Sequence, residues 1–191
     1  MRVLSLACSL NSSSTPSSSH LLSDQLLSEF HGLGVDGETV RVADHTMSPG
    51  VEKDMGEGDA WPGLRKKLLA ADILILATPI WLGHPSSVCQ RVLERLDAEL
   101  AESDEEGRLL TYGKVAGVVV VGNEDGAHKV SADESRCSCR SSCPCTSVHP
   151  SEPDFIPAVP HRGGRSLPNW RCPGQVVPSS RDRSVRGAVL L

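Results

Sequence analysis

Apolar runs of strand length alternate along most of this chain with stretches in which apolar residues recur at helical spacing. The runs predict buried strands at Arg2–Cys8, Glu38–Ala43, Ile73–Thr78 and Val115–Val121. The helical stretches are His20–Leu33 and the segments that follow Pro62 and Ser86. Alternation of this kind predicts an α/β fold with a parallel sheet and right-handed crossovers. In such folds, ligands bind beyond the carboxyl ends of the strands.

Length and charge exclude two classes of protein. A chain of 191 residues suffices for one α/β domain with a buried core. A formal net charge of −5 argues against a protein that binds nucleic acid by neutralising phosphates, and no apolar run is long enough to cross a membrane.

The apolar stretch after Met1 is too short for a secretion signal, so we expect a cytoplasmic protein. In that reducing compartment Cys8 and Cys89 are expected to be free thiols in the core.

The segment Ser9–Ser19 follows the first predicted strand and leads into a helix. Its hydroxyls and backbone N–H groups converge on the positive end of the helix dipole, which suits a phosphate dianion without any Lys or Arg. It has neither the G-x-G-x-x-G pattern nor the Walker lysine of nucleotide-binding loops. The residues alone fit an N-capped, serine-rich turn equally well.

Two further loops follow predicted strands at the same edge of the sheet. In Thr78–Ser87, an exposed Trp81 would pack against a planar ligand and Gly83 allows close backbone approach, although Trp81 also fits a residue that closes the core. We expect His84 to be solvated. The loop Gly122–Gly126 is rich in turn-forming residues, and its backbone N–H groups suit the polar edge of a ring.

Side chains near the third loop offer less. Glu124 and Asp125 are adjacent carboxylates of a kind that is usually solvated in a turn, and no His or Cys set there has metal-ligand spacing. His128 fits either a ligand contact or a surface position on a helix.

Three segments in this order resemble the flavodoxin-like NAD(P)H-dependent FMN reductase family: RVLSLACSLNSSSTPSSSHLL, ADILILATPIWLGHPSSVCQRVLERLD and GKVAGVVVVGNEDGAHKVSAD. The resemblance covers residues 1–133 and implies a flavodoxin-like parallel sheet sandwiched by helices. It also implies FMN as cofactor, NADPH or NADH as co-substrate, and a small-molecule electron acceptor such as a quinone or a free flavin. Because the flavin itself transfers hydride and electrons, no catalytic side chain and no metal is expected. Members of the family are often dimers, and a homodimer is left open.

The resemblance assigns each part of FMN to one of the three loops. The residues implied to hold the phosphate are Ser9, Asn11, Ser17, Ser18 and Ser19. Those implied to line the isoalloxazine ring are Pro79, Ile80, Trp81, Leu82 and Gly83. Those implied to contact its far edge are Gly122, Asn123, Glu124, Asp125 and Gly126.

The character of the sequence changes at Glu134. Residues 1–133 carry 11 Lys and Arg against 20 Asp and Glu, whereas residues 134–191 carry 8 Arg and no Lys against 4 acidic residues. The second region also holds 5 of the 7 Cys and 8 of the 13 Pro, and this many prolines break any long element. We therefore expect a flavodoxin-like FMN-binding domain at 1–133 that lacks its fifth strand and last helix, followed by a tail at 134–191.

Three interpretations of the tail compete. It is out-of-frame translation of a GC-rich gene, a disordered Arg/Ser/Pro-rich appendage, or a metal clip. The cysteines available for a clip are Cys137, Cys139, Cys143, Cys145 and Cys172. The abrupt break inside a predicted helix favours the first, which would leave one sheet edge open. The sequence thus favours an NAD(P)H-dependent FMN oxidoreductase. The alternatives are a flavodoxin-type electron carrier, a nonfunctional truncated product and a metal-binding regulatory module.

Overall fold

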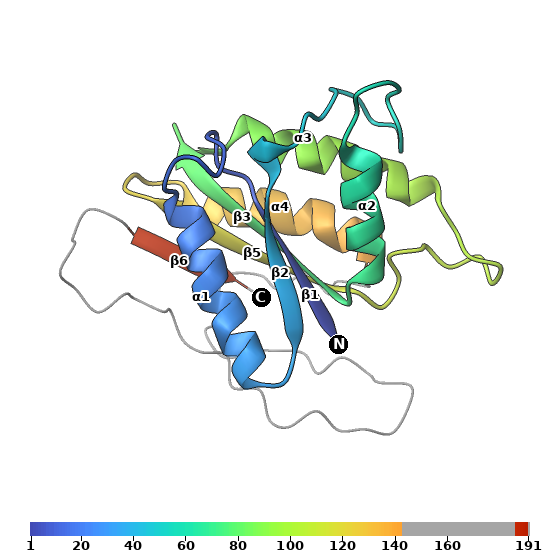
Figure 1. Ribbon diagram of the computed structural model, residues 1–191, viewed down its shortest axis with the longest axis horizontal. Coiled ribbons are helices and arrows are strands. Elements are labelled where there is room, and N and C mark those ends of the chain that lie inside the picture. Colours follow the sequence, from blue (N-terminus) through green and yellow to red (C-terminus); the bar gives the residue numbers. More distant parts are fainter. Residues whose placement is uncertain (143–185, 191) are drawn as a thin grey trace.

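A parallel sheet with helices on both faces forms the centre of the molecule (Figure 1). The computed structural model describes residues 1–142 and 186–190. Its strands are β1 (Arg2–Ala7), β2 (Asp36–Arg41), β3 (Ile73–Trp81), β4 (His84–Pro85), β5 (Val115–Gly122) and β6 (Arg186–Leu190). Its helices are α1 (Ser18–Gly32), α2 (Trp61–Ala70), α3 (Ser87–Leu96) and α4 (Ala127–Ser142), with short 3-10 helices at Val42–Asp44 and Asp97–Ala101.

The strand order β2-β1-β3-β5 is that of a flavodoxin-like sheet, and all three pairings within it are parallel. The predicted fold class is confirmed. β3 lies at the centre and is buried on both faces up to Thr78, which explains its continuous apolar sequence. The second strand begins and ends two residues earlier than predicted, because Val42 starts a 3-10 turn.

The core is divided by the sheet into two layers. Helix α1 packs on one face, where Leu27 and Phe30 meet Ile75 and Val119. Helices α2, α3 and α4 lie on the other face, on the side of the strands away from α1 (Figure 1). Trp61, at the start of α2, is fully buried in that second layer.

Helix boundaries follow local sequence signals. The Ser17 and Ser86 side chains cap α1 and α3 by accepting hydrogen bonds from backbone N–H groups three residues on. Pro62 lies in the first turn of α2, where its missing N–H costs nothing. These three helix starts lie near the carboxyl ends of the strands. The residues that start the helices therefore also shape the loops at that end of the sheet.

The sheet edge beside β5 differs from the sequence-based expectation. Residues Arg186–Leu190 form β6, which pairs antiparallel with β5 from Val118↔Leu190 to Gly122↔Arg186. That edge is therefore covered, whereas an open edge was expected. Helix α4 continues through residue 133 to Ser142, and Glu134 is fully buried. The intervening tail lies outside the described residues, and so do three of the cysteines considered for a metal clip, Cys143, Cys145 and Cys172.

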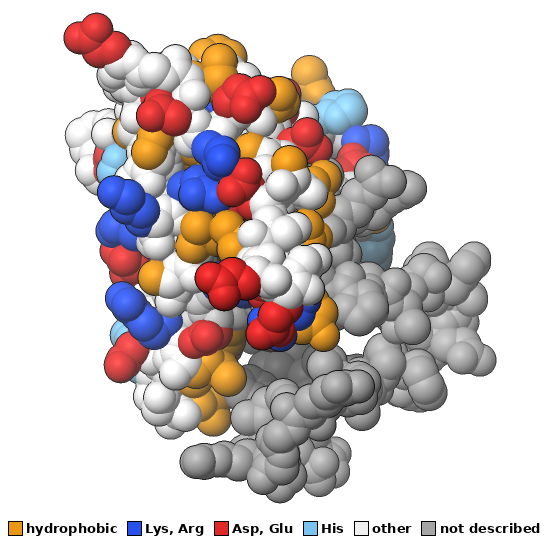
Figure 2. All heavy atoms as spheres, turned by 90° about the vertical axis from the view of Figure 1, so that its right-hand side faces the viewer, with side chains coloured by type: hydrophobic (Ala, Val, Ile, Leu, Met, Phe, Trp, Pro, Cys, Tyr) orange, Lys and Arg blue, Asp and Glu red, His pale blue; other side chains and the backbone are white. Residues whose placement is uncertain are grey.

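The surface shown in Figure 2 carries acidic and basic side chains interspersed, without a patch of one sign. Ion pairs of exposed or half-buried side chains include Lys67–Glu38, at 2.7 Å, and Lys53–Glu102, at 2.8 Å. Within the residues described, no helix is both long and apolar enough to cross a membrane. Cys8 and Cys89 are buried free thiols, as predicted.

Candidate functional site

The loop between β1 and α1 presents hydroxyl groups around the start of the helix. Ser9 is buried and its Oγ donates a hydrogen bond to the Asn11 carbonyl at 2.8 Å, while Asn11 itself is exposed. Ser17 caps α1, its Oγ lying 3.3 Å from the His20 nitrogen and 3.0 Å from Ser19 Oγ. Ser18 is exposed and Ser19 is buried. The first turn of a helix has unpaired N–H groups, so this end of α1 suits an anion.

This loop is held in place by Arg41, the last residue of β2, and by Asp44, in the 3-10 helix that follows β2. The Arg41 guanidinium donates from Nη1 to the carbonyl oxygens of Ser12, at 2.9 Å, and Thr15, at 2.6 Å. The Asp44 carboxylate accepts from the Ser13 N–H at 2.7 Å, and this bond lowers the pKa of Asp44. The loop Ser9–Ser19 itself contains no Lys or Arg, but an arginine distant in sequence contacts it.

The second predicted loop is largely a β-hairpin. β3 continues beyond Thr78 to Trp81, and Trp81 pairs with His84 of β4 across a two-residue turn. Both turn residues have positive φ, 51° at Leu82 and 74° at Gly83, as a type I′ turn requires. Sequence analysis did not predict this hairpin, because leucine is rare at a position with positive φ.

The hairpin turn exposes two large apolar side chains. Trp81 is 55% exposed and Leu82 is 89% exposed, so Trp81 does not close the core. Pro79 is half-buried, whereas Ile80 is buried against Val118, Val120 and Val130. Among the candidate ring-binding residues, Ile80 is therefore a buried support. Trp81 and Leu82 form an exposed apolar rim.

The loop after β5 packs directly on the hairpin. The Glu124 carboxylate accepts a hydrogen bond from the Leu82 N–H at 3.0 Å. Gly126, with φ of 119°, lies so close to Gly83 that a Cβ atom would come within 2.8 Å of its Cα. A Cβ on Gly122 would likewise lie 3.0 Å from Ile80 Cβ. Glycine at these two positions lets the second and third loops meet.

The remaining side chains of the third loop are exposed. Asn123 and Asp125 face solvent, and the Asp125 carboxylate accepts from the Gly126 N–H at 2.7 Å. His84 is exposed, as predicted, and its Nδ1 lies 3.2 Å from Lys129 Nζ. His128 is an exposed residue of α4. None of the residues the structure describes forms a group of three or more potential metal ligands.

Buried hydrogen bonds join the first loop to the second. Ser86 donates from Oγ to the Cys8 carbonyl and from N–H to Thr78 Oγ1, at 3.0 Å for the latter. The Cys89 thiol donates to Glu134 Oε1 at 3.3 Å. Burial raises the pKa of Glu134 to about 8, although the Cys89 hydrogen bond lowers it. This layer fixes the ends of β1 and β3 side by side.

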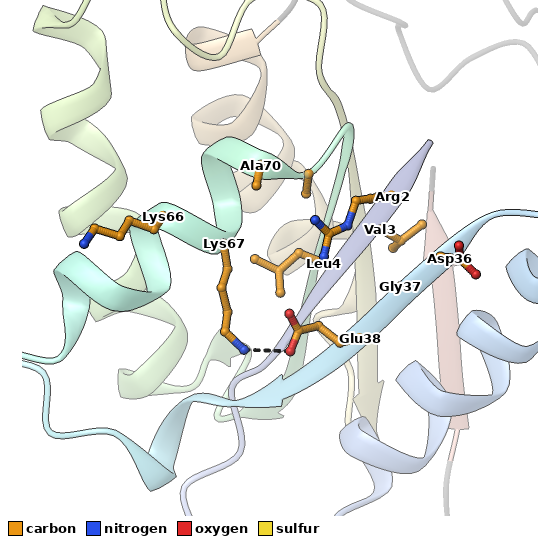
Figure 3. Close-up of a pocket in the computed structure, with 10 residues that line it drawn as sticks. Arg2, Val3, Leu4, Asp36, Gly37, Glu38, Lys66, Lys67 and Ala70 are labelled. Atoms are coloured by element: carbon orange, nitrogen blue, oxygen red, sulfur yellow. Dashed lines mark hydrogen bonds and ion pairs between the residues drawn. The ribbon is translucent and has the colours of Figure 1, made fainter.

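A surface pocket of about 510 Å³ lies at the opposite edge of the sheet (Figure 3). It is lined by the first residues of β1 and β2 and by the end of α2, with the Lys67–Glu38 ion pair across it (Figure 3). Ligands of open parallel sheets bind at the carboxyl ends of strands, and this pocket lies at the amino ends. The three converging loops are therefore the better candidate for a functional site.

Comparison with known families places the chain among FMN reductases. Residues 1–136 match the model of a family described as NADPH-dependent FMN reductase. The chain belongs to the NADPH-dependent FMN reductase family. The family expected from the sequence is thereby confirmed. All three loops of the candidate site lie inside the matched residues.

Similar proteins include two curated relatives and one solved structure. The 8-demethyl-8-aminoriboflavin-5′-phosphate synthase of Streptomyces davaonensis is 33% identical over 139 residues, covering 68% of this chain and 54% of that protein. The crystal structure of RosB with bound 8-demethyl-8-formylriboflavin-5′-phosphate has a TM-score of 0.68 at 31% identity, covering 75% of this chain and 60% of that one. The divalent metal cation transporter MntH of Mycobacterium bovis is 42% identical over 120 residues, covering 59% of this chain but 17% of that protein.

The residues at the three loops fit the cofactor of the FMN reductase family. A capped helix start with an exposed serine suits a phosphate, and the exposed face of Trp81 suits a planar ring. Gly122 and Gly126 keep the third loop close enough to the hairpin for both to face one ligand. Seven of the eleven residues of Ser9–Ser19 are serine, so small hydroxyl side chains predominate around the start of the helix.

Proposed function

We propose that this protein binds FMN noncovalently and uses NADPH or NADH to reduce a small-molecule acceptor such as a quinone or a free flavin. The observation that carries the proposal is the meeting of three strand-end loops. The Ser86–Cys8 hydrogen bond joins the first loop to the second, and the Leu82–Glu124 hydrogen bond joins the second to the third. Membership of the FMN reductase family supports it.

Each loop has a separate part in holding the flavin. Ser9, Asn11 and Ser17–Ser19 would bind the phosphate through hydroxyl and N–H groups. Pro79–Gly83 would line the ring, with Ile80 supporting the hairpin from below and Trp81 and Leu82 on the exposed side. Gly122–Gly126 would contact the far edge of the ring through backbone N–H groups.

The bound flavin supplies hydride acceptance and electron transfer, so the protein needs no nucleophile. Its own residues bind, orient and limit access to the ring. The exposed Trp81 and Leu82 side chains form an apolar rim that favours stacking of a planar donor or acceptor on the ring. The hydrogen bond from Leu82 to Glu124 fixes this rim in place.

Purified full-length protein tests the proposal. We expect it to bind FMN and to oxidise NADPH or NADH when a quinone is supplied. Trp81→Ala should weaken ring binding and slow turnover, whereas Trp81→Phe should retain most of both. Tyr112→Ala, at an exposed aromatic residue outside the three loops, serves as the matched control. Failure to bind FMN would contradict the proposal, and FMN binding without nicotinamide oxidation would favour a flavodoxin-type carrier.

A second candidate function is the conversion of FMN, as a substrate, into a riboflavin 5′-phosphate with a modified ring. The similarity to the Streptomyces synthase and to RosB, whose structure holds a flavin-phosphate intermediate, favours it. In this case FMN would be consumed rather than retained. Mass spectrometry of FMN incubated with the protein, an amine donor and oxygen separates the two candidates. A changed flavin mass would favour the second, and FMN recovered unchanged together with nicotinamide oxidation would favour the first.

A further inference from the structure

Arg41 is the last residue of β2 and lies opposite Ala7, where the chain leaves β1 for the first loop. Its side chain is 6% exposed. Both of its described hydrogen bonds go to backbone carbonyls of that loop, at Ser12 and Thr15. The guanidinium therefore lies against the segment that leads to the start of α1.

Arg41 makes no ion pair among the described residues, whereas another buried arginine does. Arg95 is also buried, and its guanidinium contacts the Asp59 carboxylate at 2.7 Å. Among the described residues no carboxylate lies within ion-pair distance of Arg41, and its Nε is buried without a hydrogen-bond partner. The nearby Asp44 carboxylate accepts from the Ser13 N–H instead, and it interacts with Arg41 only by Coulombic attraction without direct contact, which helps to lower the Asp44 pKa.

A buried cation without a counterion is costly, and an anion bound beside it removes that cost. The feature next to Arg41 is the serine-rich loop and the N-terminus of α1, where backbone N–H groups also favour an anion. Two independent features thus favour negative charge at the same loop: a capped helix start, and a buried guanidinium that makes no ion pair among the described residues and whose Nε has no hydrogen-bond partner.

We propose that Arg41 is the positioning residue that makes this loop selective for a phosphate monoester, so that FMN binds in preference to riboflavin. Arg41 fixes the course of the loop through its two carbonyl contacts and supplies the positive charge that the loop lacks. The inference rests on the proposed function for the identity of the ligand, and on the Arg41 contacts for the role of the residue.

Binding of FMN and riboflavin to the full-length protein tests this role. Arg41→Met keeps the length of the side chain but removes its charge and its hydrogen bonds. A charge-assisted contact is worth about 1.5–3 kcal/mol, so FMN affinity should fall about 10- to 100-fold while riboflavin affinity changes little. Arg41→Lys keeps the charge and should recover part of the preference for FMN. The matched control is Arg91→Met, which removes a similar guanidinium-to-carbonyl contact, at Met47.

A purely structural role would give a different result. If Arg41→Met lowered FMN and riboflavin affinity by the same factor, or lowered neither, the proposal would be overturned. A lysine variant as weak toward FMN as the methionine variant would overturn the charge component. Circular dichroism establishes that the variants fold; should Arg41→Met not fold, the lysine variant and the wild-type ratio of FMN to riboflavin affinity still decide.

Inorganic phosphate separates this inference from the proposed function. We expect phosphate to raise the Tm of the wild-type protein and to have a smaller effect on Arg41→Met. If the protein bound no flavin but phosphate still stabilised the wild type alone, the proposed function would fail and the role of Arg41 would stand. Equal effects of phosphate on both proteins would overturn the inference even if FMN bound.

Discussion

The Glu124 carboxylate accepts a hydrogen bond from the Leu82 backbone N–H at 3.0 Å, and so joins the loop after β5 to the hairpin after β3. The two residues are 42 positions apart in the sequence. Leu82 needs this support because it lies at the first position of a tight turn with a positive φ. The hydrogen bond adds to the Gly83–Gly126 packing between the two loops, and the proposed ring site lies between them.

Removal of this contact should weaken flavin binding more than it weakens the fold. Glu124→Ala leaves the Leu82 N–H to water, and we expect FMN affinity to fall about threefold to tenfold, as for loss of one hydrogen bond. Glu124→Gln retains an acceptor oxygen and should bind FMN nearly as the wild type does. Flavin fluorescence titration measures both. Equal affinity in the alanine variant and the wild type would show that the contact does not order the site.

Leu82 should be replaceable with a gain in stability. A leucine with positive φ costs about 1–2 kcal/mol, and a side chain that is 89% exposed regains little of this by burial. Asparagine tolerates this conformation, so Leu82→Asn should raise the free energy of unfolding by up to about 1 kcal/mol. Urea denaturation measures the change. Leu10→Asn, at an exposed leucine whose φ is not positive, is the control and should show no gain.

The same substitution distinguishes a functional reason for the strain. If Leu82 contributes to the apolar rim, Leu82→Asn should bind FMN or its partners less well while being more stable. A loss of stability in Leu82→Asn would contradict the strain argument. It would mean that packing of the leucine side chain outweighs the backbone strain, although that side chain is almost fully exposed.

The sequence predicted the order of the elements well because both layers of the core leave a periodic pattern. Ile73–Thr78 reads as a buried strand since both of its faces are covered, and Ser17 and Ser86 signal the helix starts by capping chemistry. It could not predict the hairpin at Leu82, because the conformation there is imposed by tertiary contacts and opposes the local preference of leucine.

The role of Arg41 was also beyond sequence reasoning. Arg41 is one polar residue at the end of a strand, and only the parallel register Ala7↔Arg41 brings it to the first loop. The third loop shows the same limit, since the Gly83–Gly126 contact links positions that no local pattern relates.

The nature of the tail stays a prediction. The change in composition at Glu134 favours out-of-frame translation, although Glu134 itself is buried and β6 pairs with β5. Sequencing of the gene decides this interpretation: a frame that no single-base shift converts into a strand and an amphipathic helix would contradict it.

Asp59 should contribute strongly to stability through its buried ion pair. The Arg95 guanidinium donates to Asp59 and to the carbonyls of Ser48 and Glu52, and it lies 5.6 Å from the centre of the Trp61 ring. Asp59→Asn leaves the buried charge of Arg95 uncompensated, so we expect a loss of about 3–5 kcal/mol in urea denaturation. Asp104→Asn, in an exposed pair with Arg108, should have a much smaller effect.

The pH dependence of stability gives a second readout for Asp59. Burial raises the pKa of Asp59, but hydrogen bonds from Arg95 and from backbone N–H groups lower it to about 2, below its ordinary value of 3.8. The stabilisation is therefore complete above pH 3.8 and is lost as the pH falls toward 2. The Asn variant should lack this part of the acid transition, and an unchanged acid slope would show that Asp59 is not responsible for it.

Glu134 should make the fold less stable as the pH rises. It is fully buried, one of its oxygens accepts from the Cys89 thiol, and the other has no partner among the described residues. Burial raises its pKa from 4.5 to about 8, so the folded state retains a proton that the unfolded state releases. Stability is full below pH 4.5 and declines up to pH 8, by about 1.4 kcal/mol per pH unit.

Glu134→Gln isolates this effect because glutamine resembles the protonated acid and does not titrate. We expect the variant and the wild type to have similar free energies of unfolding near pH 5 and the variant to be the more stable near pH 8. Glu94→Gln, at an exposed glutamate of α3, should follow the wild-type curve. Parallel curves for Glu134→Gln and the wild type between pH 5 and pH 8 would mean that Glu134 is ionised in the folded protein, against the burial argument.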